Sequence, residues 1–216
     1  MASIVETCNL ALSHIRAQSI NSLIESSIPA QQCKLHYAIL RDQMLKDTKP
    51  QFARRIDALA VRFDEVFNWA YAYQYPSDCL DIVRLIPNFE EVEQGNAYIY
   101  SPYRDPDLRQ PNLHLAVEYQ VQNIGGDRVI ASNTTEARIE YIVRVEDPNL
   151  YGPQFILAQS HLMASALAIP LVGGEQGLTM QARNLQIYQQ YVDATVASNY
   201  NEQYTDVPDS EFITVR

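Results

Sequence analysis

Histidine and cysteine are the residue types of this chain whose side chains could bind metals, exchange protons or act as nucleophiles. The four histidines, His14, His36, His114 and His161, lie far apart in the sequence and share no metal-binding spacing such as H-E-x-x-H. His161 falls inside a strongly apolar stretch. A histidine in such surroundings is usually a core residue with a hydrogen-bond partner, and we expect that role for His161.

Cys79 follows Asp78, which raises the question of a catalytic thiol. A nucleophilic cysteine needs a nearby base and an electropositive site, and the sequence identifies neither. We therefore expect a buried cysteine at the start of a strand. The cysteines as a group, Cys8, Cys33 and Cys79, are scattered along the chain and predict free, buried thiols in a reducing compartment rather than a disulfide framework.

Two glycine pairs and one acidic run are the remaining candidates for binding motifs. Gly125-Gly126 and Gly173-Gly174 lack the glycine patterns of phosphate-binding loops, so they predict a turn and a helix break. Glu90-Glu91-x-Glu93 indicates a solvent-exposed loop rather than a metal site. The sequence thus predicts no catalytic residues, no cofactor and no metal, and we expect a protein that is not an enzyme.

Alternating aromatic residues form the most distinctive pattern in the chain. Trp69, Tyr71, Tyr73 and Tyr75 occupy every second position, and Pro76 follows them. Successive side chains of a strand point to opposite faces, so we expect one strand face with four aromatic rings. Pro76 ends such a strand because proline has no N–H to donate. Aromatic faces can stack on nucleic-acid bases, but core or subunit packing is favoured here because little positive charge surrounds them.

The charge distribution argues against a protein that grips nucleic acid. The 216 residues carry a formal charge of −10, and no basic residue lies between Arg183 and Arg216. Proteins that grip phosphates need patches of lysine and arginine. A surface past which DNA slides without sticking is compatible with this composition. The N-terminus has no signal-peptide pattern and no stretch approaches the roughly 20 apolar residues of a membrane span, so we expect no membrane segment.

Helical periodicity predicts helices at both ends of the chain. Ser3 and Glu6 have capping-box spacing at the start of a first helix, and Pro29 can open a second helix that ends before Pro50. A third helix is expected from Pro153; it is apolar on nearly all sides and should be buried. A last amphipathic helix, ending near Tyr200, has its expected core face at Leu178, Ala182, Leu185, Val192 and Thr195/Val196.

The middle of the chain changes to the two-residue period of strands. Strands are expected at residues 69–75, 80–86, 97–100, 113–121, 128–131 and 137–145, in an antiparallel sheet with one wet face. Gln51–Ala60 is either a short helix or an extended segment. The predicted fold class is α+β, with a four-helix-type bundle from the N- and C-terminal helices (1–50 and 150–200) and an inserted antiparallel β-sheet region (51–149). Residues 201–216 are expected to form an extended acidic C-terminal tail.

Several strings, in order along about four fifths of the chain, carry a family resemblance. The most specific is Trp69-Ala70-Tyr71-Ala72-Tyr73-x-Tyr75-Pro76-x-Asp78-Cys79-Leu80. The others include Cys8-Asn9-Leu10-Ala11-Leu12, Arg41-Asp42-x-x-Leu45, Phe52-Ala53-x-Arg55, Tyr141-Ile142-x-Arg144-Val145-x-Asp147-Pro148 and Tyr151-x-Pro153-x-Phe155. In these strings the chain resembles the tail tubular protein A family of tailed bacteriophages, also called head-to-tail adaptors or gatekeepers. It departs from that family in the proline-rich stretch 87–112 and in the acidic tail after Tyr204.

The resemblance implies a virion structural protein of the tail or neck, present in the host cytoplasm during assembly. Such proteins form a homo-oligomeric ring, typically of twelve subunits, between the portal protein and the nozzle or tail-tube protein. The ring extends the channel through which DNA passes, without specific binding, during packaging and ejection. On this basis the terminal helices and the tail are expected to face the portal, and the β-rich middle to face the nozzle. The candidate structural or interface residues are Trp69, Tyr71, Tyr73, Tyr75, Pro76, Phe155 and Phe212.

Two other classes of function stay open from the sequence. One is a small soluble cytoplasmic enzyme that uses Cys79 or His161 on an unidentified substrate. The other is an acidic accessory binding module, including a nucleic-acid-binding factor. For that factor, binding should strengthen steeply as salt falls, and the acidic composition predicts no such binding.

Overall fold

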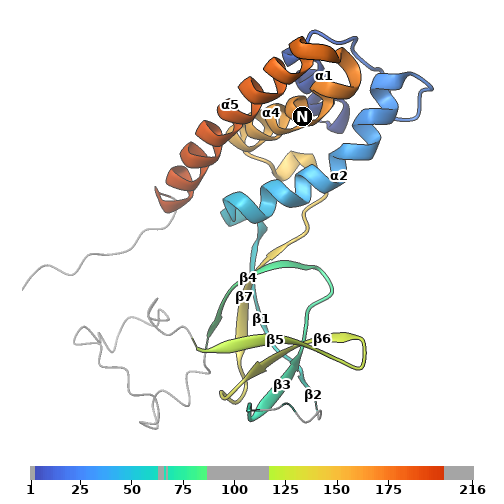
Figure 1. Cartoon of the computed structure of the whole chain (residues 1–216). Coiled ribbons are helices and arrows are strands. Elements are labelled where there is room, and N and C mark those ends of the chain that lie inside the picture. The colour runs from blue at the N-terminus through green and yellow to red at the C-terminus, as the bar shows by residue number, and fades with distance from the viewer. Residues whose placement is uncertain (1–2, 63–65, 67, 87–116, 202–216) are drawn as a thin grey trace, which may run out of the picture. The chain divides into compact units, whose positions relative to one another are not determined.

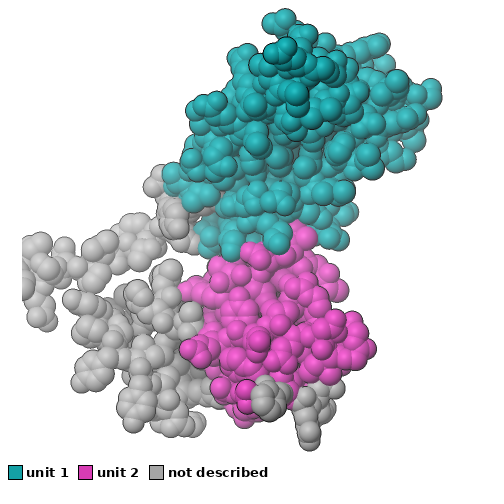
Figure 2. Space-filling view, viewed as in Figure 1, with its two compact units in different colours: residues 1–54, 142–202 teal, residues 55–141, 203–216 magenta. Residues whose placement is uncertain are grey.

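A computed structural model of the chain describes residues 3–62, 66, 68–86 and 117–201. The chain divides into two compact units (Figure 2). Unit 1 contains residues 1–54 and 142–202, and unit 2 contains residues 55–141 and 203–216. The described residues form four α-helices and two antiparallel sheets (Figure 1), so the predicted α+β class is confirmed.

Of the first two helices of unit 1, α1 (Ile4–His14) begins at the predicted cap Ser3 and α2 (Ile28–Thr48) begins with the predicted proline in its first turn. Ser3 Oγ accepts a hydrogen bond from Glu6 N at 3.1 Å, and the Glu6 carboxylate accepts one from Ser3 N at 2.7 Å. This reciprocal pair is the predicted capping box. Pro29 lies in the first turn of α2, where an N–H would have no helical partner. The helix ends at Lys49, which has a left-handed backbone (φ 43°) just before Pro50.

The other two helices, α4 (Pro153–Val172) and α5 (Gly174–Asn201), are separated by the predicted glycine break. Gly173 ends α4 with a φ of 71°, a conformation that favours glycine. Helix α4 contacts α1, α2 and α5, and its central residues from Ala158 to Ser165 are all buried, so the prediction of a buried helix is confirmed. Gly177 lets α5 approach α4 closely, because a Cβ at this position would lie 3.0 Å from the Ala168 carbonyl oxygen.

Helix α4 is also long and apolar enough to cross a membrane, contrary to the expectation from sequence. The mean hydropathy of its most apolar 18-residue window is 1.7, and 61% of that window is buried inside the structure. Core helices of globular proteins pass the same test of length and composition. The helix shares a buried cluster with α1 and α2, which includes Cys8, Leu12, Cys33, Met163 and Leu167.

Unit 2 contains a four-stranded antiparallel sheet in the order β2–β3–β6–β5. Its strands are β2 (Val61–Arg62), β3 (Tyr71–Gln74), β5 (Tyr119–Ile124) and β6 (Asp127–Ser132). In its centre Ile130 pairs with Tyr73 on one side and with Val121 on the other. Gly125 and Gly126 join β5 to β6 with φ angles of 64° and 97°. A two-residue hairpin loop of this kind needs a positive φ at both positions, so the predicted turn is confirmed.

The other sheet has the strand order β1–β7–β4, with β1 at Arg54–Ala58, β4 at Cys79–Ile86 and β7 at Arg138–Val143. A short 3-10 helix, η1 (Gln51–Ala53), precedes β1, so the ambiguous segment 51–60 contains both helix and strand. Strand β7 buries its last five residues, so the expected wet face is wrong for this strand. It lies between two neighbours, and its buried Glu140 is compensated by Arg84, whose Nε lies 2.6 Å from Glu140 Oε2.

The remaining strand predictions have mixed outcomes. The strand expected at 80–86 is observed as β4, which starts one residue earlier. The strand expected at 113–121 is wrong in its bounds, because β5 starts at Tyr119 and Val117 forms only an isolated bridge with Leu85. The expected strand 97–100, residues 113–116, the tail from 202 onward and Phe212 lie outside the described residues.

Candidate functional site

The aromatic segment 69–75 is not one continuous strand, which corrects the prediction. Asn68 has a φ of 67°, and the Trp69 N–H donates to the Val66 carbonyl at 3.3 Å, so the chain turns here. Strand β3 therefore begins only at Tyr71. Half-buried Trp69 lies before the strand, and its ring N–H donates to Gln120 Oε1 on β5 at 3.0 Å. A positive φ interrupts extended backbone, and the alternation of residue types did not reveal it.

Tyr73 is the buried anchor of this segment. Its side chain is fully buried, whereas Tyr71 is half-buried, with its ring centroid 6.4 Å from that of Tyr73. The Tyr73 hydroxyl donates to the Thr134 carbonyl and accepts from the Ala137 N–H at 3.5 Å. Tyr73 thus holds the turn between β6 and β7 in place. These contacts match core packing and leave its ring no face for base stacking.

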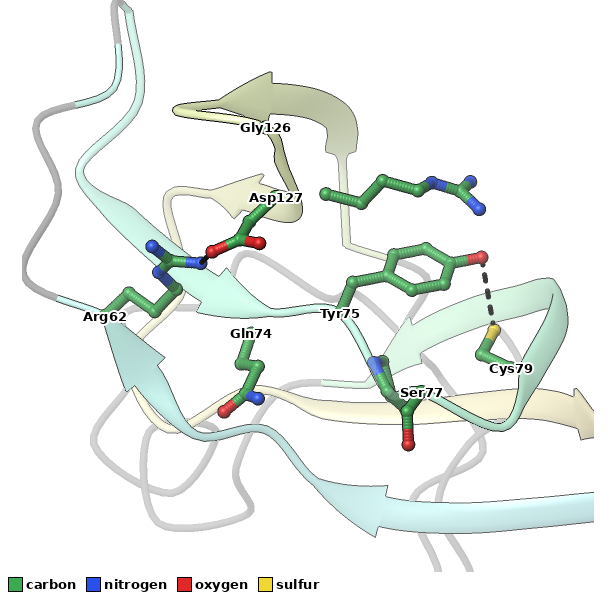
Figure 3. A pocket seen from close by; sticks show the side chains of 9 residues that line it. Arg62, Gln74, Tyr75, Ser77, Cys79, Gly126 and Asp127 are labelled. Atoms are coloured by element: carbon green, nitrogen blue, oxygen red, sulfur yellow. Dashed lines mark hydrogen bonds and ion pairs between the residues drawn. The ribbon is translucent and has the colours of Figure 1, made fainter.

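Tyr75 and Pro76 follow the end of β3 and line a pocket of about 370 Å³ (Figure 3). The lining combines β2, the end of β3, the turn into β4 and the β5–β6 hairpin. Most of its side chains are polar, with two arginines and one carboxylate. The lining residues are Arg62, Gln74, Tyr75, Pro76, Ser77, Cys79, Gly126, Asp127 and Arg128.

Three contacts fix the geometry of the pocket. Arg62 Nη1 lies 3.1 Å from Asp127 Oδ2, which forms an ion pair between β2 and the hairpin (Figure 3). The Arg128 guanidinium carbon lies 4.0 Å from the Tyr75 ring centroid, a cation–π contact. The Tyr75 hydroxyl accepts a hydrogen bond from the Cys79 thiol at 3.3 Å (Figure 3). The exposed Arg128 could therefore present its N–H groups to an anion at the pocket mouth.

The Cys79 thiol lies in surroundings that oppose its ionisation. Burial is the main cause that raises the pKa of Cys79 above its ordinary value. The pKa of Tyr75 is also raised, mainly by burial. A neutral thiol beside a neutral phenol is a poor nucleophile. Cys79 is the first residue of β4 and only 9% exposed, so the expected buried cysteine at a strand start is confirmed.

A second polar cluster in unit 2 connects residues that lie far apart in the sequence. The Tyr141 hydroxyl donates to Asp57 Oδ2 at 2.8 Å, and Asp78 Oδ1 lies 3.3 Å away. Arg55 Nη1 pairs with the other Asp78 oxygen at 2.7 Å, with both side chains about half exposed. Sequence reasoning did not predict this contact. The only signal was that Arg55, Asp78 and Tyr141 all occur in the family-like strings.

A polar cluster of residues far apart in the sequence also occurs in unit 1. Asp42 accepts hydrogen bonds from the largely buried Arg41 at 2.8 Å and from Arg144 at 3.0 Å. The aromatic residue Phe155 lies in the core of the same unit. It is 2% exposed, and its ring centroid lies 5.3 Å from that of Phe52 and 4.8 Å from that of Tyr151. Phe155 is therefore a core residue of unit 1. Among the described residues, no group of three or more His, Cys, Asp or Glu side chains is arranged to hold a metal ion.

His161 has the predicted role of a hydrogen-bonded core histidine. It is 8% exposed, and its Nδ1 lies 2.9 Å from Asn184 Oδ1. The sequence did not predict that His14 stacks on it, with ring centroids 3.9 Å apart and planes inclined by 12°. The two residues are 147 positions apart, on α1 and α4, so only the packing of these helices brings them together.

Two helices of unit 1 expose regularly spaced aliphatic residues. On α2 the exposed fractions are 65% for Ile28, 61% for Leu35 and 68% for Ile39; we call these three residues the α2 stripe. On α5, Leu178 and Leu185 are 57% and 51% exposed; we call these two the α5 stripe. The expected core face of α5 is thus wrong at these two positions and at Ala182, which is also exposed. It is confirmed at Val192 and Thr195, which are buried together with Asn184 and Tyr188.

Comparison with protein-family models and with curated proteins gives no match for this chain.

Proposed function

We propose that this chain is a ring-forming head-to-tail adaptor of a tailed bacteriophage virion, with a structural role and no catalysis. The observation that carries the proposal is the pair of exposed apolar stripes on α2 and α5. Figure 1 draws the helices that carry them, α2 in blue and α5 in orange to red. A closed ring uses head-to-tail contacts, in which one surface of each subunit meets a different surface of the next. In this proposal the two apolar stripes would supply these two surfaces.

The spacing within the two stripes supports direct helix-to-helix packing. Ile28 and Leu35 are seven residues apart, as are Leu178 and Leu185. Seven residues of α-helix span about 10.5 Å, so the two pairs have the same axial repeat. Aliphatic residues recurring at this spacing can interdigitate between neighbouring helices. Exposed apolar residues gathered on one helix face, unlike single scattered ones, are typical of interaction sites.

Charges beside the stripes favour pairing of α2 with α5 of another copy. Helix α2 carries exposed Lys34 and Lys46, two of the three lysines in the chain, and one exposed carboxylate, Asp47, which accepts a hydrogen bond from Tyr188. Helix α5 carries exposed Glu175 and Asp193, while its exposed Arg183, two positions before Leu185, lies on the opposite side of the helix. Opposite charges on the rims of two apolar surfaces steer association and fix register. A second copy of this chain therefore fits the α2 stripe better than an unrelated basic partner would.

The family resemblance supplies the rest of the proposal. The strings that carry it contain residues that meet in two polar clusters, Arg41–Asp42–Arg144 in unit 1 and Arg55–Asp78–Tyr141 in unit 2. Such contacts give a structural reason for these residues to occur together. The four helices of unit 1 would serve as the bundle of the adaptor, and the terminal helices and the tail would face the portal. Unit 2 would face the nozzle or tail-tube protein, in a ring of about twelve subunits through which DNA passes without specific binding, because the chain is acidic.

The mass of the particle in solution tests this proposal. We expect the purified protein, mixed with its portal protein, to form a multisubunit complex by mass photometry. Leu35→Glu should reduce assembly by at least tenfold, because a charge would be buried in the contact. Leu150→Glu is the matched control, since Leu150 is also an exposed leucine (57%) but lies outside both stripes. A chain that remains monomeric with portal present would contradict the adaptor function.

A further inference from the structure

Three aromatic rings from three helices form a continuous stack in unit 1. His14 on α1 stacks on His161 of α4 at a centroid distance of 3.9 Å. His161 in turn stacks on Tyr191 of α5 at 5.5 Å, with planes inclined by 16°. His161 is almost fully buried, and His14 is half-buried. The stack therefore links α1 and α5 through the buried helix α4.

Hydrogen bonds fix which nitrogen of His161 carries the proton. Asn184 Nδ2 donates to the Met180 carbonyl at 2.8 Å, which leaves Asn184 Oδ1 as the acceptor facing His161. The contact of 2.9 Å between His161 Nδ1 and that oxygen therefore requires a proton on Nδ1. In its neutral form His161 has no proton on Nε2.

The same reasoning applies to His14. Ser160 Oγ donates its only proton to the Leu157 carbonyl at 2.7 Å. It can therefore only accept from His14 Nε2, which lies 3.1 Å away, so His14 carries its proton on Nε2. Each histidine thus uses its single proton in a hydrogen bond, and the neutral pair is fully consistent with its surroundings.

A second proton on His14 is disfavoured. It would place a cation 3.9 Å from the His161 ring centroid, at a junction where water is partly excluded. The titratable groups that face His14 in the stack are His161 from α4 and, behind it, the Tyr191 phenol from α5. The direct hydrogen-bond partners, Ser160 and Asn184, are neutral and provide no compensating negative charge.

We propose that the His14–His161–Tyr191 stack is an acid-sensitive latch that holds α5 against α1 and α4 at neutral pH and releases it in mild acid. Release would act on the helix that carries the α5 stripe. The latch does not depend on the ring proposal, because every contact in it lies within one unit of one chain.

The direction of the pH effect follows from linkage. Burial, and secondarily the electrostatic interaction with the adjacent His161 ring, lower the pKa of folded His14 below its ordinary value of 6.5. Above about pH 6.5, His14 is neutral in both the folded and the unfolded state, so protonation does not weaken the latch. Below that pH the unfolded or released state binds the proton first, so the latch weakens as the pH falls. Each pKa unit between the two states corresponds to an approximately tenfold change in the equilibrium.

Hydrogen exchange of α5 in the full-length protein tests the latch. We expect the protection of amides at 180–195, corrected for the intrinsic rate, to fall about tenfold between pH 7.5 and 5.5. The informative variant combines His14→Gln and His161→Asn, because each amide donates near the position of the nitrogen that the original histidine uses. Protection in this variant should change less than about twofold over the same range. His36→Gln, on α2 and outside the stack, should behave as wild type.

Two results would overturn the proposal. One is wild-type protection of α5 that stays constant from pH 7.5 to 5.5. The other is a double variant that loses protection in acid as steeply as wild type does. If the double variant does not fold, an NMR titration of the wild-type histidine rings decides, and a folded His14 that protonates at or above pH 6.5 refutes the latch.

Discussion

The two units of this molecule use their large apolar side chains differently. In unit 1 the rings of Phe52, Tyr151 and Phe155 pack on one another at 4.8–5.7 Å, while aliphatic residues on α2 and α5 face solvent. In unit 2, the Tyr73 hydroxyl donates a hydrogen bond to the Thr134 carbonyl in the turn after β6, and the Trp69 ring N–H donates one to Gln120 on β5. Unit 2 also exposes the aliphatic residues Ile56, Val61 and Val121, at 38–47%. The stripes on α2 and α5 are more exposed, at 51–68%, and leave a larger apolar surface that another molecule can cover. In the proposed adaptor, the helices would therefore carry the assembly contacts.

The largest effect is expected for Phe155→Ala in unit 1. Phe155 is 2% exposed and has an edge-to-face contact with Phe52, so its loss leaves a cavity between the rings. We expect the free energy of unfolding to fall by about 3–5 kcal/mol. Urea denaturation followed by circular dichroism at 222 nm, which reports the helices, measures it. A change below about 1 kcal/mol would show that the ring cluster does not stabilise unit 1.

A smaller effect is expected for Tyr73→Phe in unit 2. The substitution keeps the buried ring but removes the hydroxyl that bonds the Thr134 carbonyl and the Ala137 N–H. Leaving buried backbone groups without partners should cost about 1–3 kcal/mol. Near-ultraviolet circular dichroism during urea denaturation reports it, with Tyr71→Phe, at a half-buried ring, as the control. Equal stability of the Tyr73→Phe variant and wild type would mean that the sheet does not depend on this polar anchor.

The smallest effect is expected for Trp69→Phe. Trp69 is only half-buried, and its bond to Gln120 is at the surface. We expect a loss of about 0.5–1 kcal/mol, measured by the same denaturation, because water can replace the exposed bond. A loss as large as that for Phe155→Ala would contradict the contrast between the two units.

Local signals predicted the helices better than the strands. The capping box at Ser3, the proline at the start of α2 and the glycine at the end of α4 act within a few residues of their own position, so they are visible in the sequence. The burial of a strand depends on its neighbours, as in β7, where Glu140 is buried because Arg84 of β4 pairs with it. Likewise, the alternating aromatic residues predicted a strand from residue 69, but the turn at Asn68 delays its start to Tyr71.

The sequence predicted single site residues but not their combinations. The buried state of Cys79 and the hydrogen-bonded state of His161 followed from their neighbours in the chain. The stacking of His14 on His161 and the contact of Arg128 with Tyr75 depend on tertiary packing and left no signal in the spacing. The exposure of Leu178 and Leu185 was missed for another reason. Periodicity shows that a helix has apolar residues at core spacing, but it does not show which of them the neighbouring helices cover.

Cysteine cross-linking between the two stripes tests the central claim most directly. One variant carries Leu35→Cys on α2 and a second carries Leu185→Cys on α5, while the native cysteines in the described part of the chain are all buried. The two variants are mixed under assembling conditions, with portal protein present, and oxidised. We predict a disulfide-linked dimer in the mixture and none with either variant alone, because head-to-tail contacts pair unlike surfaces. Cross-linking of Leu35→Cys to itself, or no cross-link in the mixture, would contradict the account.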